Sequence, residues 1–422
     1  MLTALILFLT TYAALLILPK FRSYVALISA ALFVLFGILP VEKVFQSVDW
    51  NVILMIAGTM GIVFLFIESK MPSLLADLII SKMPNVKWVI IALSLFAGII
   101  SAFVDNVATV LMVAPVALVV AKKLNSSPVP AIIAIAISSN LQGAATLVGD
   151  TTSILLGGYA DMDFLDFFVY KGHVGLFWVV QAGAILSAVT LLIVFRRYGQ
   201  KVDLEEHTVV TDFFPTWLLL GTVVFLILAS FIPEKPHVTN GLICMGLMIV
   251  GLVRESFLRG AFKTTFTQAF KEIDWYTLLL LSGLFIVIAG IAEAGVVDEI
   301  SRVFVRMSGG NLFAIYSLLV WASVVFSAFI DNIPYVATML PVTAGIARLM
   351  GVDPTILYFG LLCGATLGGN LTPIGASANI TALGILRKYG YEASTKDFMK
   401  ISIPFTLTAV FSGYLLVWFI WM

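Results

Sequence analysis

Long apolar runs separated by short polar segments follow one another along the chain, from residues 2–18 to residues 401–421. A helix needs about 20 apolar residues to cross roughly 30 Å of hydrocarbon, so this pattern predicts membrane-spanning helices. Four tracts are longer and contain polar interruptions: residues 87–121, 129–157, 312–347 and 355–386. We therefore expect an all-α integral membrane protein with about ten spans, in which the four interrupted tracts form special elements.

Matching motifs in the two halves of the chain indicate an internal duplication. Val48-Asp49-Trp50 recurs as Ile273-Asp274-Trp275, and the sequence SAFVDN at residues 101–106 recurs as SAFIDN at 327–332. Each motif keeps its place in the order of the apolar runs. The sequence therefore predicts two repeats, and the boundaries are as follows: residues 1–196, a cytoplasmic linker at 197–214, and residues 215–422.

The Asp-Asn pair in tract 87–121 indicates a re-entrant hairpin. The tract is too long for one span, and Asp105 and Asn106 stand at its middle with apolar residues on both sides. A surface loop between two spans normally carries more turn-forming residues than this. We expect Asp105 and Asn106 at the tip of one hairpin and Asp331 and Asn332 at the tip of a second. Five crossings per repeat then make the two repeats inverted. In the alternative, the tract makes two full crossings, each repeat has six, and the repeats are parallel.

Basic residues divide unequally between the two faces that this topology creates. One face receives only six of the 24 lysines and arginines, namely Lys43, Lys171, Lys235, Arg302, Arg306 and Arg348. Short loops rich in lysine and arginine stay in the cytoplasm. The other face is therefore predicted to be cytoplasmic, and both termini are predicted to lie on the non-cytoplasmic side of the inner (plasma) membrane.

Composition narrows the class of function. The chain is 61% hydrophobic and 11% charged, and its 24 basic and 24 acidic residues cancel. No basic stretch could follow a phosphate backbone, so nucleic-acid binding is excluded. The two cysteines and three histidines show no metal-binding or nucleophile spacing, so we expect no enzyme activity and no resident cofactor. A small ion as substrate and the lipid bilayer as surroundings fit this composition.

Three carboxylates fall inside the apolar tracts, at Asp105, Asp150 and Asp331. A charged side chain at the middle of a bilayer costs about 2.5–3.5 kcal/mol, so each of them needs an explanation. Each can cap the helix that follows it, and each can bind a coupling proton or cation. The two roles are compatible. Since no lysine or arginine lies inside these tracts, apart from Lys87 at the very start of the first, we expect a site without a fixed positive charge.

Glycines, hydroxyls and amides interrupt the tracts 129–157 and 355–386, and Pro373 removes a backbone donor in the second. Helix hydrogen bonds must fail at such places. We therefore expect two broken helices, whose free carbonyls can bind Na⁺ and whose half-helix N-termini carry partial positive charge. The alternative is that the glycines only let neighbouring helices pack closely.

The motifs Asp105-Asn106, Asp331-Asn332-Ile333-Pro334 and GGNLTPIGASAN at residues 368–379 resemble the ion transporter superfamily. The resemblance is to the branch that holds the arsenical-pump proteins, the P protein and NhaD-type sodium/proton antiporters, with a citrate transporter-like domain. It covers nearly the whole chain. It implies an inverted-repeat elevator-type transporter with two re-entrant hairpins and two broken helices, and a homodimer.

The same resemblance implies where substrate and coupling ion bind. The substrate-binding residues would be Asn106, Asn332, Ser139, Asn140, Thr146, Asn370, Thr372, Ser377 and Asn379. The coupling-ion residues would be Asp105, Asp150 and Asp331, with Na⁺ positions at Asn106, Gly149, Asn332 and Gly375. Coupling would be to H⁺ or Na⁺.

Two motifs decide how the candidate substrates rank. Thr372-Pro373-Ile374-Gly375 agrees with the arsenite pumps, whereas Gly149-Asp150-Thr151-Thr152 departs from the Gly-Asp-Pro-Pro of the P protein and NhaD. Proton-coupled efflux of arsenite or a similar neutral oxyacid is the first hypothesis, because such a solute suits a site without fixed positive charge. A sodium/proton antiporter is second, and a sodium-coupled anion (dicarboxylate) transporter is third. A channel is the alternative from another class.

Overall fold

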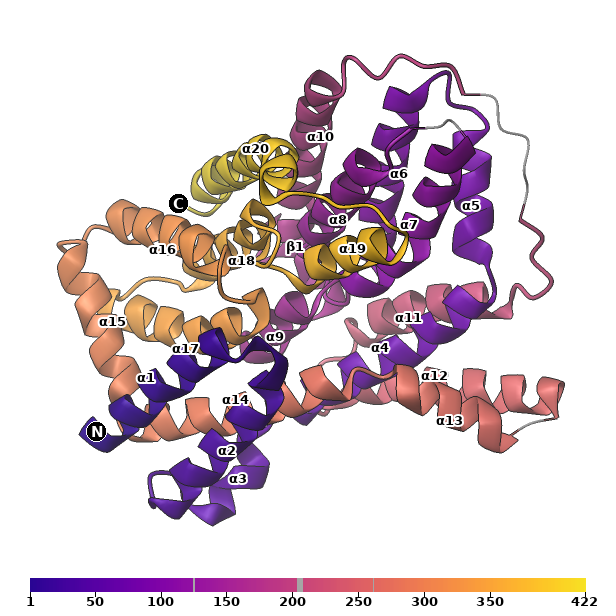
Figure 1. Ribbon diagram of the computed structural model, residues 1–422. Coiled ribbons are helices and arrows are strands. Elements are labelled where there is room, and N and C mark those ends of the chain that lie inside the picture. The colour runs from indigo at the N-terminus through magenta and orange to yellow at the C-terminus, as the bar shows by residue number, and fades with distance from the viewer. Residues whose placement is uncertain (124–125, 203–207, 261) are drawn as a thin grey trace.

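The computed structural model describes the chain except residues 124–125, 203–207 and 261, and its helices form two layers (Figure 1). The lower layer in this view contains α1 (Leu2–Ile17), α2 (Arg22–Leu35), α3 (Val41–Ser47), α4 (Trp50–Glu68), α11 (Phe214–Ala229), α12 (Thr239–Arg259), α13 (Phe262–Glu272) and α14 (Trp275–Glu293). Part of the predicted linker 197–214 lies outside the described residues.

The upper layer contains the remaining helices. They are α5 (Met71–Ile80), α6 (Val86–Ser101), α7 (Asn106–Lys123), α8 (Val129–Gly143), α9 (Thr151–Tyr159), α10 (Leu176–Val194), α15 (Val296–Met307), α16 (Leu312–Ser327), α17 (Asn332–Met350), α18 (Thr355–Gly368), α19 (Ser377–Lys388) and α20 (Thr395–Trp421). Short elements join them: the 3₁₀ turns η1 (Pro19–Phe21), η2 (Phe164–Phe167) and η3 (Gly369–Leu371), and the antiparallel strands β1 (Val169–Tyr170) and β2 (His173–Val174).

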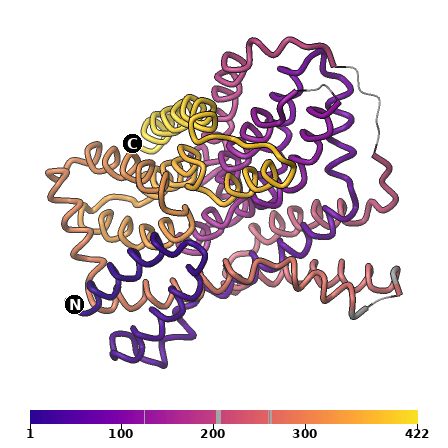
Figure 2. Tube along the Cα trace, viewed as in Figure 1, coloured from indigo at the N-terminus to yellow at the C-terminus, as the bar shows by residue number. Residues whose placement is uncertain are grey.

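Helices from distant parts of the chain pair in the lower layer, where violet and pink segments alternate in Figure 2. α4 packs along α12, and α14 packs along α2. Glycines make both contacts close. A Cβ added at Gly58 would lie 2.5 Å from the backbone carbon of Cys244, and one at Gly283 would lie 2.7 Å from that of Ala26. Small residues let helix backbones approach in this way within membranes.

Seven helices are long and apolar enough to cross a membrane, and the number reaches nine if each of two bent pairs counts as one span, within the described residues. This measure supports seven to nine spans and leaves out shorter apolar helices such as α11, so the finer prediction of ten spans is not shown. α1 and α2 are 16 and 14 residues long and meet at 112°, so they form one of the two bent pairs. The seven also include α7 and α17, which belong to the predicted hairpins.

The breaks expected inside the four special tracts are present. α6 ends at Ser101 and α7 begins at Asn106, while α16 ends at Ser327 and α17 begins at Asn332. α8 ends at Gly143 and α9 begins at Thr151; α18, η3 and α19 repeat this interruption near Pro373. The segment 138–143, which carries hydroxyl and amide side chains of the first interrupted tract, is still helical.

Replacing Gly58 with alanine should lower the thermal stability of the protein in detergent. The added methyl would meet backbone atoms of α12, which cannot move aside as a flexible side chain can, and overpacking of this kind costs about 1–3 kcal/mol. Gly246→Ala on α12 is the matched control, because no atom lies within 4 Å of its added Cβ. Equal unfolding temperatures for the two variants would contradict the close α4–α12 contact.

Candidate functional site

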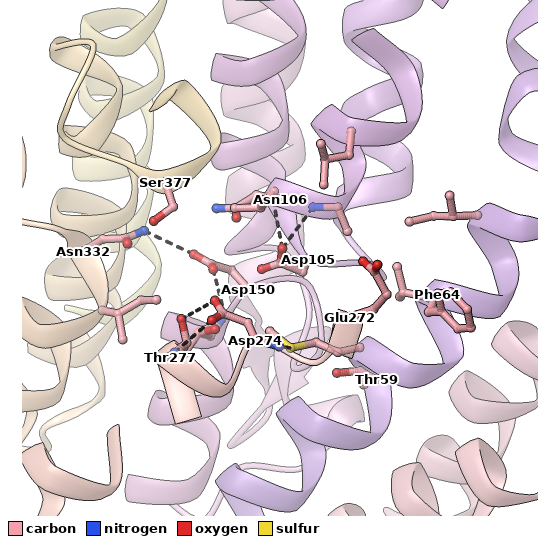
Figure 3. A pocket seen from close by; sticks show the side chains of 18 of the residues that line it. Thr59, Phe64, Asp105, Asn106, Asp150, Glu272, Asp274, Thr277, Asn332 and Ser377 are labelled. Carbon is pink, nitrogen blue, oxygen red and sulfur yellow. Dashed lines mark hydrogen bonds between the residues drawn. The ribbon is translucent and has the colours of Figure 1, made fainter. Parts of the chain in front are cut away.

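A cavity of about 270 Å³ lies where the two layers meet, beside the tips of both hairpins (Figure 3). Five carboxylate side chains line it, together with polar and apolar groups from α4, α7 and the start of α14: Glu68, Asp105, Asp150, Glu272 and Asp274. Among the described residues that line it there is no lysine, arginine or histidine. The cavity therefore attracts cations and repels anions.

Asp105 caps α7 from the tip of the first hairpin. Its Oδ1 accepts hydrogen bonds from the backbone N–H of Val107 at 2.9 Å and of Ala108 at 3.1 Å. The capping role predicted for this residue is confirmed at Ala108, while the N–H of Thr109 bonds to the backbone carbonyl of Asp105 instead. No basic side chain forms an ion pair with Asp105 among the described residues.

Asp150 reaches the cavity from the break between α8 and α9. It caps α9 as expected, accepting from the N–H of Thr151 at 2.8 Å and the hydroxyl of Thr152 at 2.9 Å. The side-chain amide of Asn332, from the tip of the second hairpin, donates to its Oδ2 at 3.3 Å (Figure 3). Asp150 thus links the first broken helix to the second hairpin.

Asp331 has a basic partner from outside the apolar tracts, so this predicted site residue lies beside a fixed positive charge, although Arg22 is not among the residues that line the cavity. Its Oδ2 lies 3.3 Å from Nη1 of Arg22, and the side chains are only 7% and 12% exposed. Ser377 donates to the same oxygen at 3.0 Å, and the N–H of Ile333 donates to Oδ1 at 3.2 Å. The contact of Arg22 with Asp331 could not be predicted from the sequence, because Arg22 stands in a polar turn between two apolar runs and is far from Asp331 along the chain.

Asparagine side chains connect the two broken helices behind the cavity. Asn106 donates to Asn140 at 2.8 Å, and Asn140 donates to Asn370 at 2.7 Å and to Asn379 at 3.0 Å. Asn379 in turn donates to the carbonyls of Gly369 and Thr372. Every one of these asparagines is buried. The network satisfies backbone carbonyls that the breaks release, so it fixes the shape of the interruptions.

Three carbonyl oxygens converge beside each broken helix. A Cβ built on Gly149 would lie 2.7 Å from the oxygen of Gly143, 2.9 Å from that of Ser101 and 3.0 Å from that of Ala102. We call this the first carbonyl cluster.

The second carbonyl cluster lies beside Gly375. The same construction on this glycine gives 2.6 Å to Gly369, 2.8 Å to Ala328 and 2.8 Å to Ser327. Only glycine fits either position. Thr146 and Thr372 donate a hydrogen bond to one oxygen of each cluster, Ala102 and Ala328 respectively. A carbonyl oxygen has a second lone pair, so these oxygens can still bind a cation.

The structure brings the predicted residues together at two depths. Asn106, Asn332, Ser377, Asp105 and Asp150 line the cavity. Behind it lie the buried residues Ser139, Asn140, Thr146, Asn370, Thr372 and Asn379, which bond to protein groups. Sequence reasoning missed the lining from the lower layer, above all Thr59, Phe64, Glu272 and Thr277. The one sequence signal for this part of the lining was Asp274, which matches Asp49 across the two repeats. The position of each aspartate before a helix indicates only an N-cap, and both do cap their helices.

Comparison with protein families finds a match to the citrate transporter family (CitMHS) over residues 6–364 and 265–422. An uncharacterized transporter of Mycobacterium tuberculosis is 31% identical over 94% of this chain and 93% of its own. A 46 kDa membrane protein of Mycobacterium leprae is 30% identical over 98% of this chain and 97% of its own. The human P protein is 27% identical over 89% of this chain, which spans 54% of the P protein.

Two solved structures share the fold. The YdaH transporter of Alcanivorax borkumensis matches with a TM-score of 0.61 over 89% of this chain and 86% of its own. MtrF of Neisseria gonorrhoeae, described as one of a class of antimetabolite efflux pumps, matches with a TM-score of 0.53 over 95% of this chain and 94% of its own. Both are 15% identical to this chain, so the likeness concerns the fold alone.

Asn140→Ala should destabilise the protein, because it leaves Asn106, Asn370 and Asn379 each without one hydrogen-bond partner. A buried polar group left unpaired costs about 1–3 kcal/mol. Ser139→Ala is the matched control, because Ser139 is equally buried on the same helix. Among the described residues, its hydroxyl bonds only to the carbonyl of Ala136, one turn away. Thermal unfolding in detergent measures both, and an equal effect of the two substitutions would contradict the network.

Proposed function

The chain belongs to the citrate transporter family, whose members are secondary transporters rather than enzymes, and we propose that it exchanges sodium ions for protons. The observation that carries the proposal is the cavity with five carboxylates and no basic side chain among the described residues that line it. A cavity of this charge raises the local concentration of cations. The sodium/proton exchange ranked second on sequence grounds therefore becomes the first candidate.

The chemistry of exchange would rest on Asp105 and Asp150. A carboxylate can hold a proton or help to bind a sodium ion, but it cannot do both at once, and this competition is what an antiporter needs. Backbone carbonyls at breaks in membrane helices are typical sodium ligands. The carbonyl clusters beside Gly149 and Gly375 support the predicted Na⁺ positions, with Asn106 and Asn332 close by at the hairpin tips.

Alternating access would come from movement of the upper layer against the lower layer, as in an elevator. The cavity lies at the boundary between the layers. Within the lower layer, each close pair joins one helix from each half of the chain, α4 with α12 and α2 with α14. This matching supports the proposed inverted repeats, 1–196 and 215–422. A homodimer, implied by the resemblance, remains part of the proposal.

Four ion pairs between distant segments support the proposed topology, because they bear on which loops share a face of the membrane. Each joins two loops that the predicted topology places on the same face: Lys43–Glu293, Lys171–Asp353, Lys235–Asp163 and Arg254–Asp212. Glu68 and Glu272 border the cavity next to Lys70 and Lys271, on the face with most of the basic residues. The cavity would thus open to the cytoplasm, with both termini outside.

Export of a neutral oxyacid such as arsenite is the second candidate. The amides of Asn106 and Asn332 and the hydroxyl of Ser377 face the cavity and can bond to an uncharged oxygenated solute. The described lining holds five carboxylates and no basic side chain that could bind a dicarboxylate, so anion transport fits the site least well.

Sodium added to inside-out membrane vesicles that contain the protein should dissipate an imposed pH gradient, because sodium entering the vesicle would drive protons out. At one sodium per proton, a one-unit gradient supports about tenfold sodium accumulation. Asp105→Asn should abolish the exchange. Glu293→Gln, which removes an exposed carboxylate paired with Lys43, should leave it unchanged.

Parallel vesicles should receive arsenite and citrate in place of sodium. Proton-coupled arsenite flux without sodium exchange would overturn the first candidate in favour of the second. Citrate flux would overturn both. A flux that stays linear at high substrate would indicate a channel.

Gly149→Ala should raise the sodium concentration for half-maximal exchange at least tenfold, while the protein stays folded. The methyl group would occupy the space at which three carbonyl oxygens converge. Gly384→Ala on α19 is the control, since no atom lies within 4 Å of its added Cβ. An unchanged sodium concentration for half-maximal exchange in Gly149→Ala would contradict a role of the first carbonyl cluster.

A further inference from the structure

The aspartates at the two hairpin tips have equivalent places in the sequence but different electrical surroundings. Asp105 accepts hydrogen bonds from two backbone N–H groups and faces the cavity. Asp331 accepts from one backbone N–H and one serine hydroxyl, and it also contacts the guanidinium of Arg22 at 3.3 Å. Only the second tip therefore has a positive charge supplied by the protein, within the described residues.

Arg22 is held in place by the elbow between α1 and α2. Its Nε donates to the carbonyl of Leu15 at 3.2 Å, and its backbone N–H donates to the hydroxyl of Tyr276 at 2.6 Å. The same hydroxyl donates to the carbonyl of Pro19 at 2.8 Å. The turn of the chain thus directs the guanidinium toward the hairpin tip, where Asp331 is its one charged partner among the described residues.

We propose that Arg22 is a built-in counter-ion that takes the place of a coupling cation at Asp331 in this arrangement of the two layers. The inference rests on the proposed sodium/proton exchange and deepens it. Among the described residues, the first tip brings Asp105 and the nearby Asp150 to the cavity without a fixed counter-ion, whereas the carboxylate of the second tip is already paired with Arg22. The coupling role predicted for Asp331 is then filled by an arginine of the same chain.

The physical argument is charge balance at a site with little water. A nearly buried carboxylate without a partner is costly, so it must take up a proton, a metal ion or a fixed cation. Arg22 meets this requirement at Asp331, because its charge is permanent. Asp105 has no such partner among the described residues, so its counter-ion must come through the cavity. Removing Arg22 should therefore create an additional cation site at Asp331.

The contact also joins the two layers. Arg22 begins α2 in the lower layer, whereas Asp331 precedes α17 in the upper layer, and the hydroxyl of Tyr12 on α1 donates to the carbonyl of Pro334 beside it at 2.8 Å. The second tip is thus seated on the α1–α2 elbow. Asp331 contacts its counter-ion Arg22 only while the two layers keep the relative position seen in this structure.

Equilibrium binding of radioactive sodium to the purified full chain in detergent tests the proposal. We expect Arg22→Gln to bind one more sodium ion per chain than the wild type. The double variant Arg22→Gln/Asp331→Asn, which removes both charges, should bind the same number as the wild type. Asp105→Asn should bind one fewer.

Two results would overturn the role of Arg22. One is an Arg22→Gln variant that binds no more sodium than the wild type. The other is a double variant that binds one ion fewer than the wild type, since Asp331 would then hold sodium beside Arg22. The double variant leaves no unpaired buried charge, so we expect it to fold even if Arg22→Gln alone does not. Its comparison with the wild type then decides the test. Absence of sodium binding and exchange in the wild type would instead contradict the proposed function, while the difference between the variants still reports on Arg22.

Discussion

Backbone groups freed in the interior of a membrane protein must be satisfied by the protein itself, and the rest of this structure depends on how that is done. Two helices break near the middle of the molecule. Asn140, Asn370 and Asn379 bond to one another across the breaks and to carbonyls beside them. Because amides hold these breaks open, carbonyl oxygens can converge at Gly149 and Gly375, and the cavity can form beside them.

Local chemistry made the interruptions predictable from sequence. Gly149, Gly375 and Pro373 stand where a helix cannot continue, and the Asp-Asn pairs mark the hairpin turns because carboxylates are rare in such apolar surroundings. The capping of α7 and α9 followed from the same residues. The residues that indicate each break lie within a few positions of it, so the breaks could be predicted without knowledge of any tertiary contact.

Contacts between distant segments could not be predicted in this way. Arg22 and Asp331 meet because a bend of 112° between α1 and α2 directs a turn toward the second hairpin, and nothing in the residues around Arg22 indicates that bend. Glu272 reaches the cavity for a similar reason, since its position depends on how α13 leads into α14. Which asparagines line the cavity and which lie behind it also depends on packing. The sequence does not separate them, because all of them are polar residues at similar positions beside helix breaks.

The pairing of α4 with α12 and of α14 with α2 bears on how the protein is made. Each close contact joins a helix of the first half to a helix of the second, through Gly58 against Cys244 and Gly283 against Ala26. The partner of α4 emerges from the ribosome only after the whole first half has been synthesised. Until then α2 and α4 stand in the membrane with their packing faces open to lipid, so the lower layer closes late and neither half can complete it alone.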